Sequence, residues 1–199
     1  MTVKRLSGEE ALTGAPAAGG TVLDFWQWAF SDLRQNSIRG VFAEWLVGQL
    51  LGLPLTVRDP WSAWDLITPQ GVKVEVKCGA YLQAWHGPDA PPSSIVFGGL
   101  RNRVDSPDGR KFSELPSYNA DLYVFCVQTC HDPTAWNALD VSQWCFHLLT
   151  REELVRLNVK SLTLTTLAKQ APRLSVVEFQ SAAATLIAQL TAERESDPE

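Results

Sequence analysis

The chain has 199 residues, of which 45% are hydrophobic and 20% are charged, and its formal net charge is −5. This length and composition fit one domain that can bury a proper core. The acidic balance excludes a general polyanion binder, so any contact with nucleic acid has to come from a local basic patch.

The sequence contains no membrane span, and its start leads into acidic residues rather than into the apolar run of a secretory signal. The four cysteines lack the paired spacing of a disulfide framework, which favours a reducing compartment. We therefore expect a cytoplasmic protein without membrane contact. Its expected organisation is a flexible N-terminal segment over residues 1–20, a single domain over 21–192 and a charged tail over 193–199.

Two helices are expected at the start of the domain. Apolar residues recur at helical spacing from Thr21, which can act as the N-cap. A second helix is expected from about Ser37 to Leu51, because Gly52-Leu53-Pro54 is a strong stop signal. This second helix is apolar nearly all round, so we expect it to be buried.

Glu44 is the single acid in the middle of the second helix. A buried, ionised glutamate is costly unless it has a partner. One interpretation is structural, with Glu44 paired with Arg39 or Arg58. The other is functional, with Glu44 directed into an active site.

Residues 64–78 form the stretch around which the rest of the chain is organised, and they are typical of a β-hairpin. Val72, Val74 and Val76 alternate with three charged residues, so the valines share one face and the charges share the other. The charged residues are Lys73, Glu75 and Lys77.

The turn of this hairpin sets its register. Thr68-Pro69-Gln70-Gly71 suits a three-residue loop closed by a left-handed glycine bulge, which pairs Thr68 with Val72. Asp65 then lies opposite Glu75, while Trp64 and Leu66 fall on the valine side. A two-residue turn would instead place Asp65 opposite Val74.

An aspartate, a glutamate and a backbone carbonyl on one face make a hard oxygen site suited to Mg²⁺. Lys77 could then reach a water on the metal or a scissile phosphate. The alternative is a solvated amphipathic hairpin whose charges form exposed cross-strand pairs, each worth at most about 1 kcal/mol.

Asp65 followed by Glu75-Val76-Lys77 resembles the D-x(n)-E-x-K active site of the PD-(D/E)XK, or restriction-endonuclease-like, nuclease superfamily. Trp64 stands where the family name has proline. The resemblance covers residues 36–150 and implies an α/β (α+β) three-layer domain, with a mixed central β-sheet flanked by helices.

The resemblance also implies roles for particular residues. Asp65, Glu75 and the Val76 carbonyl would hold Mg²⁺, for which Mn²⁺ can substitute, and Lys77 would orient the attacking water or stabilise developing charge. Glu44 would match the extra acid that a preceding helix supplies to the metal site in many members, where it would complete the metal shell or position a water. Gln83 would match a glutamine that positions substrate in several branches; the alternative is a surface residue at the start of a helix.

Downstream, the loop over residues 101–111 concentrates positive charge, and it is our candidate nucleic-acid contact unless it is simply solvated. Its basic residues are Arg101, Arg103, Arg110 and Lys111. Residues 121–128 predict a central strand, apolar on both faces, and Gln143 to Leu149 predict another.

The remaining signals concern the C-terminal part. Thr150 to Glu153 is a capping box, and a last helix is expected from about Ser175 to Ala192. Cys126, Cys130 and His131 lack the matching second pair of a zinc site.

Together these features predict a metal-dependent endo- or exonuclease that hydrolyses phosphodiester bonds, with DNA favoured, acting in restriction, defence or repair. Two alternatives stay open. One is an inactive module of the same fold that binds nucleic acid or a protein partner. The other is a metal-dependent phosphoesterase that acts on small molecules.

Overall fold

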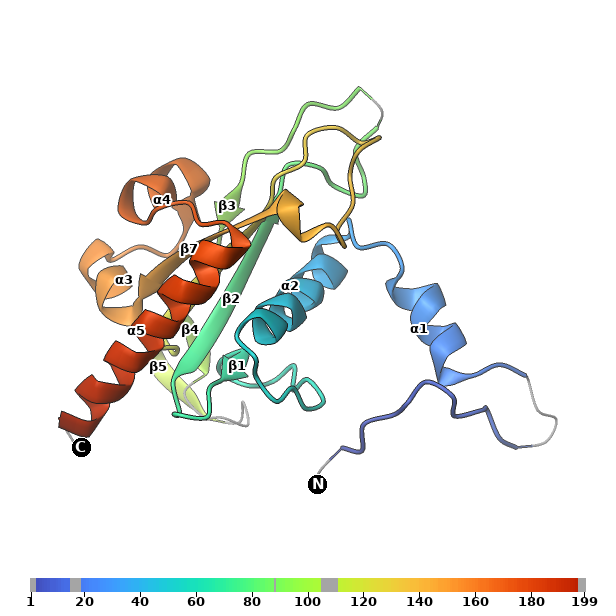
Figure 1. The fold of residues 1–199 in the computed structure, drawn as a ribbon, viewed down its shortest axis with the longest axis horizontal. Coiled ribbons are helices and arrows are strands. Elements are labelled where there is room, and N and C mark those ends of the chain that lie inside the picture. The colour runs from blue at the N-terminus through green and yellow to red at the C-terminus, as the bar shows by residue number, and fades with distance from the viewer. Residues whose placement is uncertain (1–2, 15–18, 88, 105–110, 197–199) are drawn as a thin grey trace.

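The computed structural model describes residues 3–14, 19–87, 89–104 and 111–196. Its centre is a four-stranded mixed sheet with the order β1-β2-β6-β7, in which β2 and β6 are parallel and the other two pairings are antiparallel. Helices cover both faces of the sheet (Figure 1). The predicted mixed α/β class is therefore confirmed. The strands are β1 (Leu66–Ile67), β2 (Lys73–Ala80), β6 (Leu122–Gln128) and β7 (Trp144–Thr150).

Strand β6 lies between two neighbours, and all seven of its residues are buried. Tyr123, Phe125 and Val127 face one apolar cluster, while Leu122, Val124 and Cys126 face the other. A strand enclosed on both faces needs apolar residues at every position, as this sequence has. The predicted central strand is confirmed.

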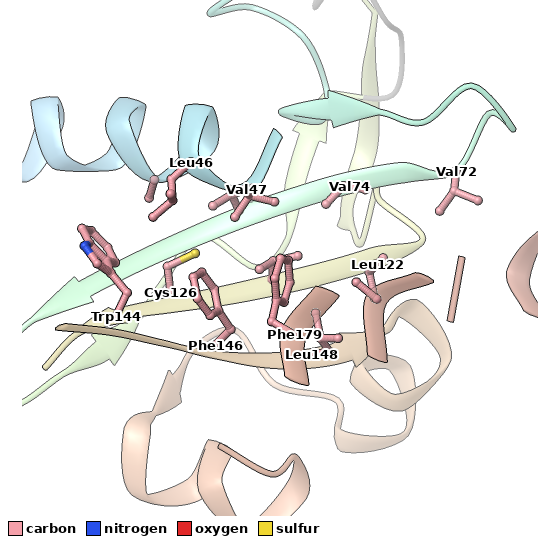
Figure 2. Close-up of a cluster of buried hydrophobic side chains, with 14 of the residues drawn as sticks. Leu46, Val47, Val72, Val74, Leu122, Cys126, Trp144, Phe146, Leu148 and Phe179 are labelled. Carbon is pink, nitrogen blue, oxygen red and sulfur yellow. The ribbon is translucent and has the colours of Figure 1, made fainter. Parts of the chain in front are cut away.

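One face of the sheet is covered by α2 (Asn36–Leu50) and α5 (Val176–Ser196). Figure 2 shows Leu46 and Val47 of α2 in one row with Val74 and Val72, and Phe179 of α5 beside Phe146. The rings of Phe146 and Phe179 stack with their centroids 4.5 Å apart. The three valines of the hairpin belong to this cluster, as their alternation predicts.

The opposite face is covered by two short helices and by the connection between β2 and β6. Thr150 and Glu153 form the predicted capping box at the start of the first helix. In its described part, the connection contains three short strands and no helix. These elements are α3 (Arg151–Leu157), α4 (Leu164–Gln170), β3 (Val96–Phe97), β4 (Asn102–Val104), β5 (Phe112–Ser117) and β8 (Leu162–Thr163), with a 3-10 turn, η1 (Val141–Gln143), before β7.

Gly79 allows the connection to lie directly on β2. A Cβ atom at this position would lie 2.5 Å from the Cγ2 of Ile95, so a side chain larger than hydrogen cannot be accommodated without a shift. The glycine at this position therefore lets the side chains of Ile95 and Phe97 pack directly on β2.

The N-terminal region lies to one side of the sheet (Figure 1). It contains α1 (Val22–Phe30), which Thr21 and Asp24 cap as expected, and the backbone N–H of Leu23 donates to the carbonyl of Gly8. Within the described residues, no helix has the length and apolarity needed to cross a membrane.

Two helices differ from their prediction. The last helix continues past Ala192 to Ser196, and Arg194 donates to Oδ2 of Asp121 at 2.6 Å, so part of the expected tail is helical and contacts the domain. Helix α2 is only partly buried, because Val41 and Trp45 are exposed. They lie four positions apart on one side of the helix, while Leu46 and Val47 fill the core.

The hairpin has the predicted bulged register. Leu66 pairs with Val74 and Ile67 with Lys73, while the N–H of Thr68 donates to the carbonyl of Val72. Gly71 has a φ of 82°, in the left-handed region. Asp65 is therefore the residue that meets Glu75.

The prediction for Trp64 was wrong. It packs against the cluster on the charged side of β2, and Nζ of Lys73 lies 4.3 Å from its ring centroid. Strand β1 begins only at Leu66, so strict alternation does not extend back to Trp64.

The left-handed glycine gives a test of the register. Gly71→Val should lower the free energy of unfolding by about 1 to 2 kcal/mol, because a β-branched residue is strained at positive φ. Gln70→Ala, in the same turn, should have little effect. Urea denaturation of both variants measures this, and equal stabilities would contradict the bulged turn.

Candidate functional site

The first residue of the site, Asp65, directly precedes the edge strand β1. Oδ2 of Asp65 accepts a hydrogen bond of 2.7 Å from the backbone N–H of Val76. The carboxylate thus takes the place of a strand carbonyl along the open edge of β2. In a strand, the N–H and C=O of one residue point to the same side, so the Val76 carbonyl is directed to this edge as well.

Glu75 and Lys77 lie on one face of β2, and the valines lie on the other face. Nζ of Lys77 lies 2.7 Å from Oε1 of Glu75, and both side chains are largely shielded from solvent. A Cβ atom on Gly99 would lie 3.6 Å from Nζ of Lys77, so the connection passes over this pair. The charged face of the hairpin is therefore enclosed, in contrast to a solvated hairpin.

The carboxyl groups carry perturbed pKa values. The pKa of Asp65 is raised from 3.8 to about 7, mainly by burial and then by the charges of Glu75 and Glu44, against the Val76 N–H and Lys77, which lower it. The pKa of Glu75 is also raised, mainly by burial, although Lys77 opposes this shift. The site therefore favours a bound proton or cation.

Glu44 reaches the same region from α2. Its carboxylate is held by two bonds from the guanidinium of Arg58, one of them 2.7 Å long between Oε1 and Nη2, and by none from Arg39. It is also close enough to Asp65 and Glu75 to raise the pKa of each. Glu44 is therefore paired with Arg58, as its structural interpretation predicts, and its charge acts on the other two acids.

Gln83 is not brought to the carboxylates. Its Oε1 accepts a bond of 3.1 Å from Nη2 of Arg39, and its Nε2 donates to the carbonyl of Ala80 at 2.9 Å. Because the side chain is buried with both polar ends used, it is also not the surface residue of the alternative.

The basic loop is a β4–β5 hairpin in its described part, and Arg110 lies outside the described residues. The guanidinium of Arg101 lies 4.7 Å from the ring centroid of Tyr118, and Nε of Arg103 donates to the carbonyl of Glu114 at 3.2 Å. Lys111 is exposed. Local contacts thus hold the two arginines near the segment that covers Lys77.

A cavity of about 330 Å³ lies between α2 and residues 53–59, and our sequence-based predictions did not include it. Its lining includes Glu44, Asp65 and Arg58 together with Trp45 and Trp64. Only the four-residue spacing of Val41 and Trp45, away from the core positions of α2, could have indicated it.

Across the described ranges, no three side chains of histidine, cysteine, aspartate or glutamate lie close enough together to hold a metal ion. This includes Cys126, which is buried in the apolar cluster, and His131, which stacks on Tyr81. Mg²⁺, however, often takes only one or two protein carboxylates and keeps several waters. Asp65 and Glu75, whose pKa values are raised mainly by burial, fit this requirement.

No protein-family model matches this chain, and searches of curated proteins and of solved structures gave no significant match. The chemistry of the site therefore has to be argued from its own residues.

The raised pKa of Asp65 predicts a pH-dependent stability. The folded protein holds this proton up to a pH of about 7, whereas the unfolded chain loses it near 3.8, so stability falls as the pH rises between these values. Asp65→Asn should therefore stabilise the metal-free protein at pH 8 by about 1 to 3 kcal/mol and change little at pH 4.

Glu178→Gln is the matched control, because the cap that Glu178 forms with Ser175 lowers the pKa of Glu178. Thermal unfolding in EDTA across this pH range measures both variants. Stabilisation by Glu178→Gln, or destabilisation by Asp65→Asn at pH 8, would contradict the electrostatic description.

Proposed function

We propose that this protein is a metal-dependent nuclease of the PD-(D/E)XK type, which hydrolyses phosphodiester bonds of nucleic acid, with DNA favoured. One observation carries the proposal: Oδ2 of Asp65 accepts the Val76 N–H beside Glu75, whose carboxylate lies 2.7 Å from Nζ of Lys77. A half-buried and a buried acid with a lysine at the edge of a sheet are an expensive arrangement for a protein without a use for them.

The fold supports the same proposal. A helix, α2, precedes the hairpin and brings Glu44 towards Asp65 and Glu75, as the resemblance implies. The hairpin is part of a mixed sheet with helices on both faces. The restriction-endonuclease-like architecture is our interpretation of this arrangement.

Each residue of the site would have its own role in the reaction. Asp65, Glu75 and the Val76 carbonyl would hold Mg²⁺ or Mn²⁺ at the open edge of β2. When bound, the cation supplies neutralisation of phosphate charge and activation of water. Lys77, oriented by Glu75, would place its ammonium beside the reacting phosphate and stabilise negative charge as it develops. The connection over Lys77 would limit access of bulk water.

Glu44 would have a different task from the one first expected. Its pairing with Arg58 leaves it in the outer part of the site, where the pair adds both a carboxylate and a cation. Arg58, whose pKa is raised mainly by its hydrogen bonds to Glu44, would remain charged and could contact a phosphate.

A second candidate function is a binding module without catalysis. It is favoured because each carboxylate already binds a group of the same chain. Arg58 binds Glu44, Lys77 binds Glu75, and the Val76 N–H donates to Asp65. Such a module would bind nucleic acid equally well with and without a divalent metal, which separates the two functions.

The catalytic roles predict two classes of variant. Lys77→Ala should leave Mn²⁺ binding nearly intact and slow cleavage by roughly 10²- to 10⁴-fold, because it removes charge stabilisation but no ligand. Asp65→Ala and Glu75→Ala should lose metal affinity together with activity. Calorimetric Mn²⁺ titration and cleavage of plasmid, linear duplex, single strand and RNA measure these effects.

Lys73→Ala is the matched control, since Lys73 lies on the same face of β2 but stacks on Trp64. It should cost far less activity than Lys77→Ala. If the wild-type protein binds no divalent metal and Lys77→Ala behaves like it on every substrate, the binding module replaces the nuclease.

The basic hairpin predicts a salt dependence. If Arg101, Arg103, Arg110 and Lys111 each contact a phosphate, the log–log slope of duplex affinity against salt should be about −3 to −4, from roughly −0.9 per contact. The double variant Arg101→Ala, Arg103→Ala should reduce the slope by about two.

The control removes the same charge elsewhere, through Lys169→Ala with Arg173→Ala, two exposed residues on α4 and just after it. Fluorescence anisotropy over a salt series gives the slopes. An unchanged slope in the hairpin variant would place the nucleic acid on another surface.

A further inference from the structure

The cavity between α2 and residues 53–59 has an unusual composition for a surface hollow. Glu44, Arg58, Asp59 and Asp65 contribute charge, while the rest of the lining is mainly apolar. The apolar side chains include Val41, Trp45, Leu53, Leu55, Val57 and Ile67. A small-molecule site commonly combines an apolar lining with a few polar groups in this way.

Four of these apolar residues are also unusually exposed. The exposed fractions are 50% for Trp45, 52% for Ile67, 40% for Val41 and 39% for Val57. They come from three separate segments of the chain, so no single element explains their exposure. Large apolar side chains gathered around a hollow indicate a ligand whose inserted part is flat and apolar. Because three of the four charged residues in the lining are acids, a phosphate next to them would rely on the cation of the proposed function.

We propose that this cavity takes one unpaired nucleobase of single-stranded DNA, while the adjoining phosphate lies against Asp65, Glu75 and Lys77. The inference rests on the proposed function and adds its substrate class. Every base has a π-face that can stack on tryptophan whatever the sequence, and Trp45 presents half of its surface for this purpose.

Asp65 joins the two halves of the proposed site. It lines the cavity, and it also accepts the Val76 N–H beside Glu75. A nucleotide has the same arrangement, since its base and its phosphate are attached to one sugar. Arg58 lines the cavity and could contact the next phosphate along the strand.

The proposed pocket favours single strands. At about 330 Å³ it is at the lower end of the range for small-molecule pockets, which leaves room for one base. A base within a duplex is stacked on both faces and would have to leave the helix to enter. Duplex should therefore be a poor substrate unless it frays or contains an unpaired nucleotide.

The test measures binding in a Lys77→Ala background with Mn²⁺, so that cleavage does not interfere. The probes are a labelled oligothymidylate, the same strand with abasic sites, and a duplex. Trp45→Ala should weaken binding of the intact strand by about 5- to 100-fold and leave the abasic strand and the duplex unchanged. Trp45→Phe should largely restore binding.

Trp28→Ala is the matched control, because Trp28 is 85% exposed on α1 and does not line the cavity. It should change nothing. Equal weakening of intact and abasic strands by Trp45→Ala, or an effect as large on duplex, would overturn the base pocket. Competition by thymidine monophosphate as tight as binding of the strand would overturn single-stranded DNA as its source.

Cleavage assays with the native Lys77 distinguish a failure of the base pocket from a failure of the proposed function. Metal-dependent cleavage of single strands that Trp45→Ala does not affect would leave the nuclease standing and overturn the pocket. Absence of cleavage and of metal binding, with Trp45-dependent binding retained, would support the pocket and overturn the nuclease.

Discussion

Strand β2 has to satisfy two demands at once, and the rest of the structure follows from them. Its valine side chains must be buried under α2 and α5, while Glu75 and Lys77 must lie on the other face, beside Asp65. A slip of one residue in the hairpin would drive these charges into the apolar cluster, so burial of the valines fixes the register of the site. Asp121 secures the far end of the same strand, where Oδ2 accepts the Lys73 N–H at 2.8 Å.

The site stores electrostatic free energy that the fold must supply. Burial and the charges of neighbouring acids raise the pKa values of Asp65 and Glu75, and Lys77 offsets only part of this. The apolar clusters on the two faces of the sheet hold the acids together despite the repulsion. Such a local conflict between chemistry and stability is expected where a protein binds a ligand or carries out a reaction.

The sequence could predict those features that depend on near neighbours. The Gly71 bulge, the Thr150 capping box and the all-apolar β6 each follow from a short stretch of residues, and the structure has all three. Partners distant in the chain could not be predicted in the same way. Gln83 bonds to Arg39, which lies on α2, and the choice of Arg58 over Arg39 for Glu44 depends on how residues 53–59 pack. The exposure of Val41 and Trp45 likewise depends on how the rest of the chain packs around α2.

The parallel pairing of β2 with β6 has a consequence for the order in which the site forms. The β1–β2 hairpin joins residues that are close in sequence, whereas β6 can pair with β2 only after the long connection between them has closed on itself. We expect the hairpin to form early, with Asp65 and Glu75 still in water, and the acids to lose their hydration only in the late step that docks β6 and lays the connection over Lys77. Folding speed and site assembly are thereby limited by one event, the closure of this long loop.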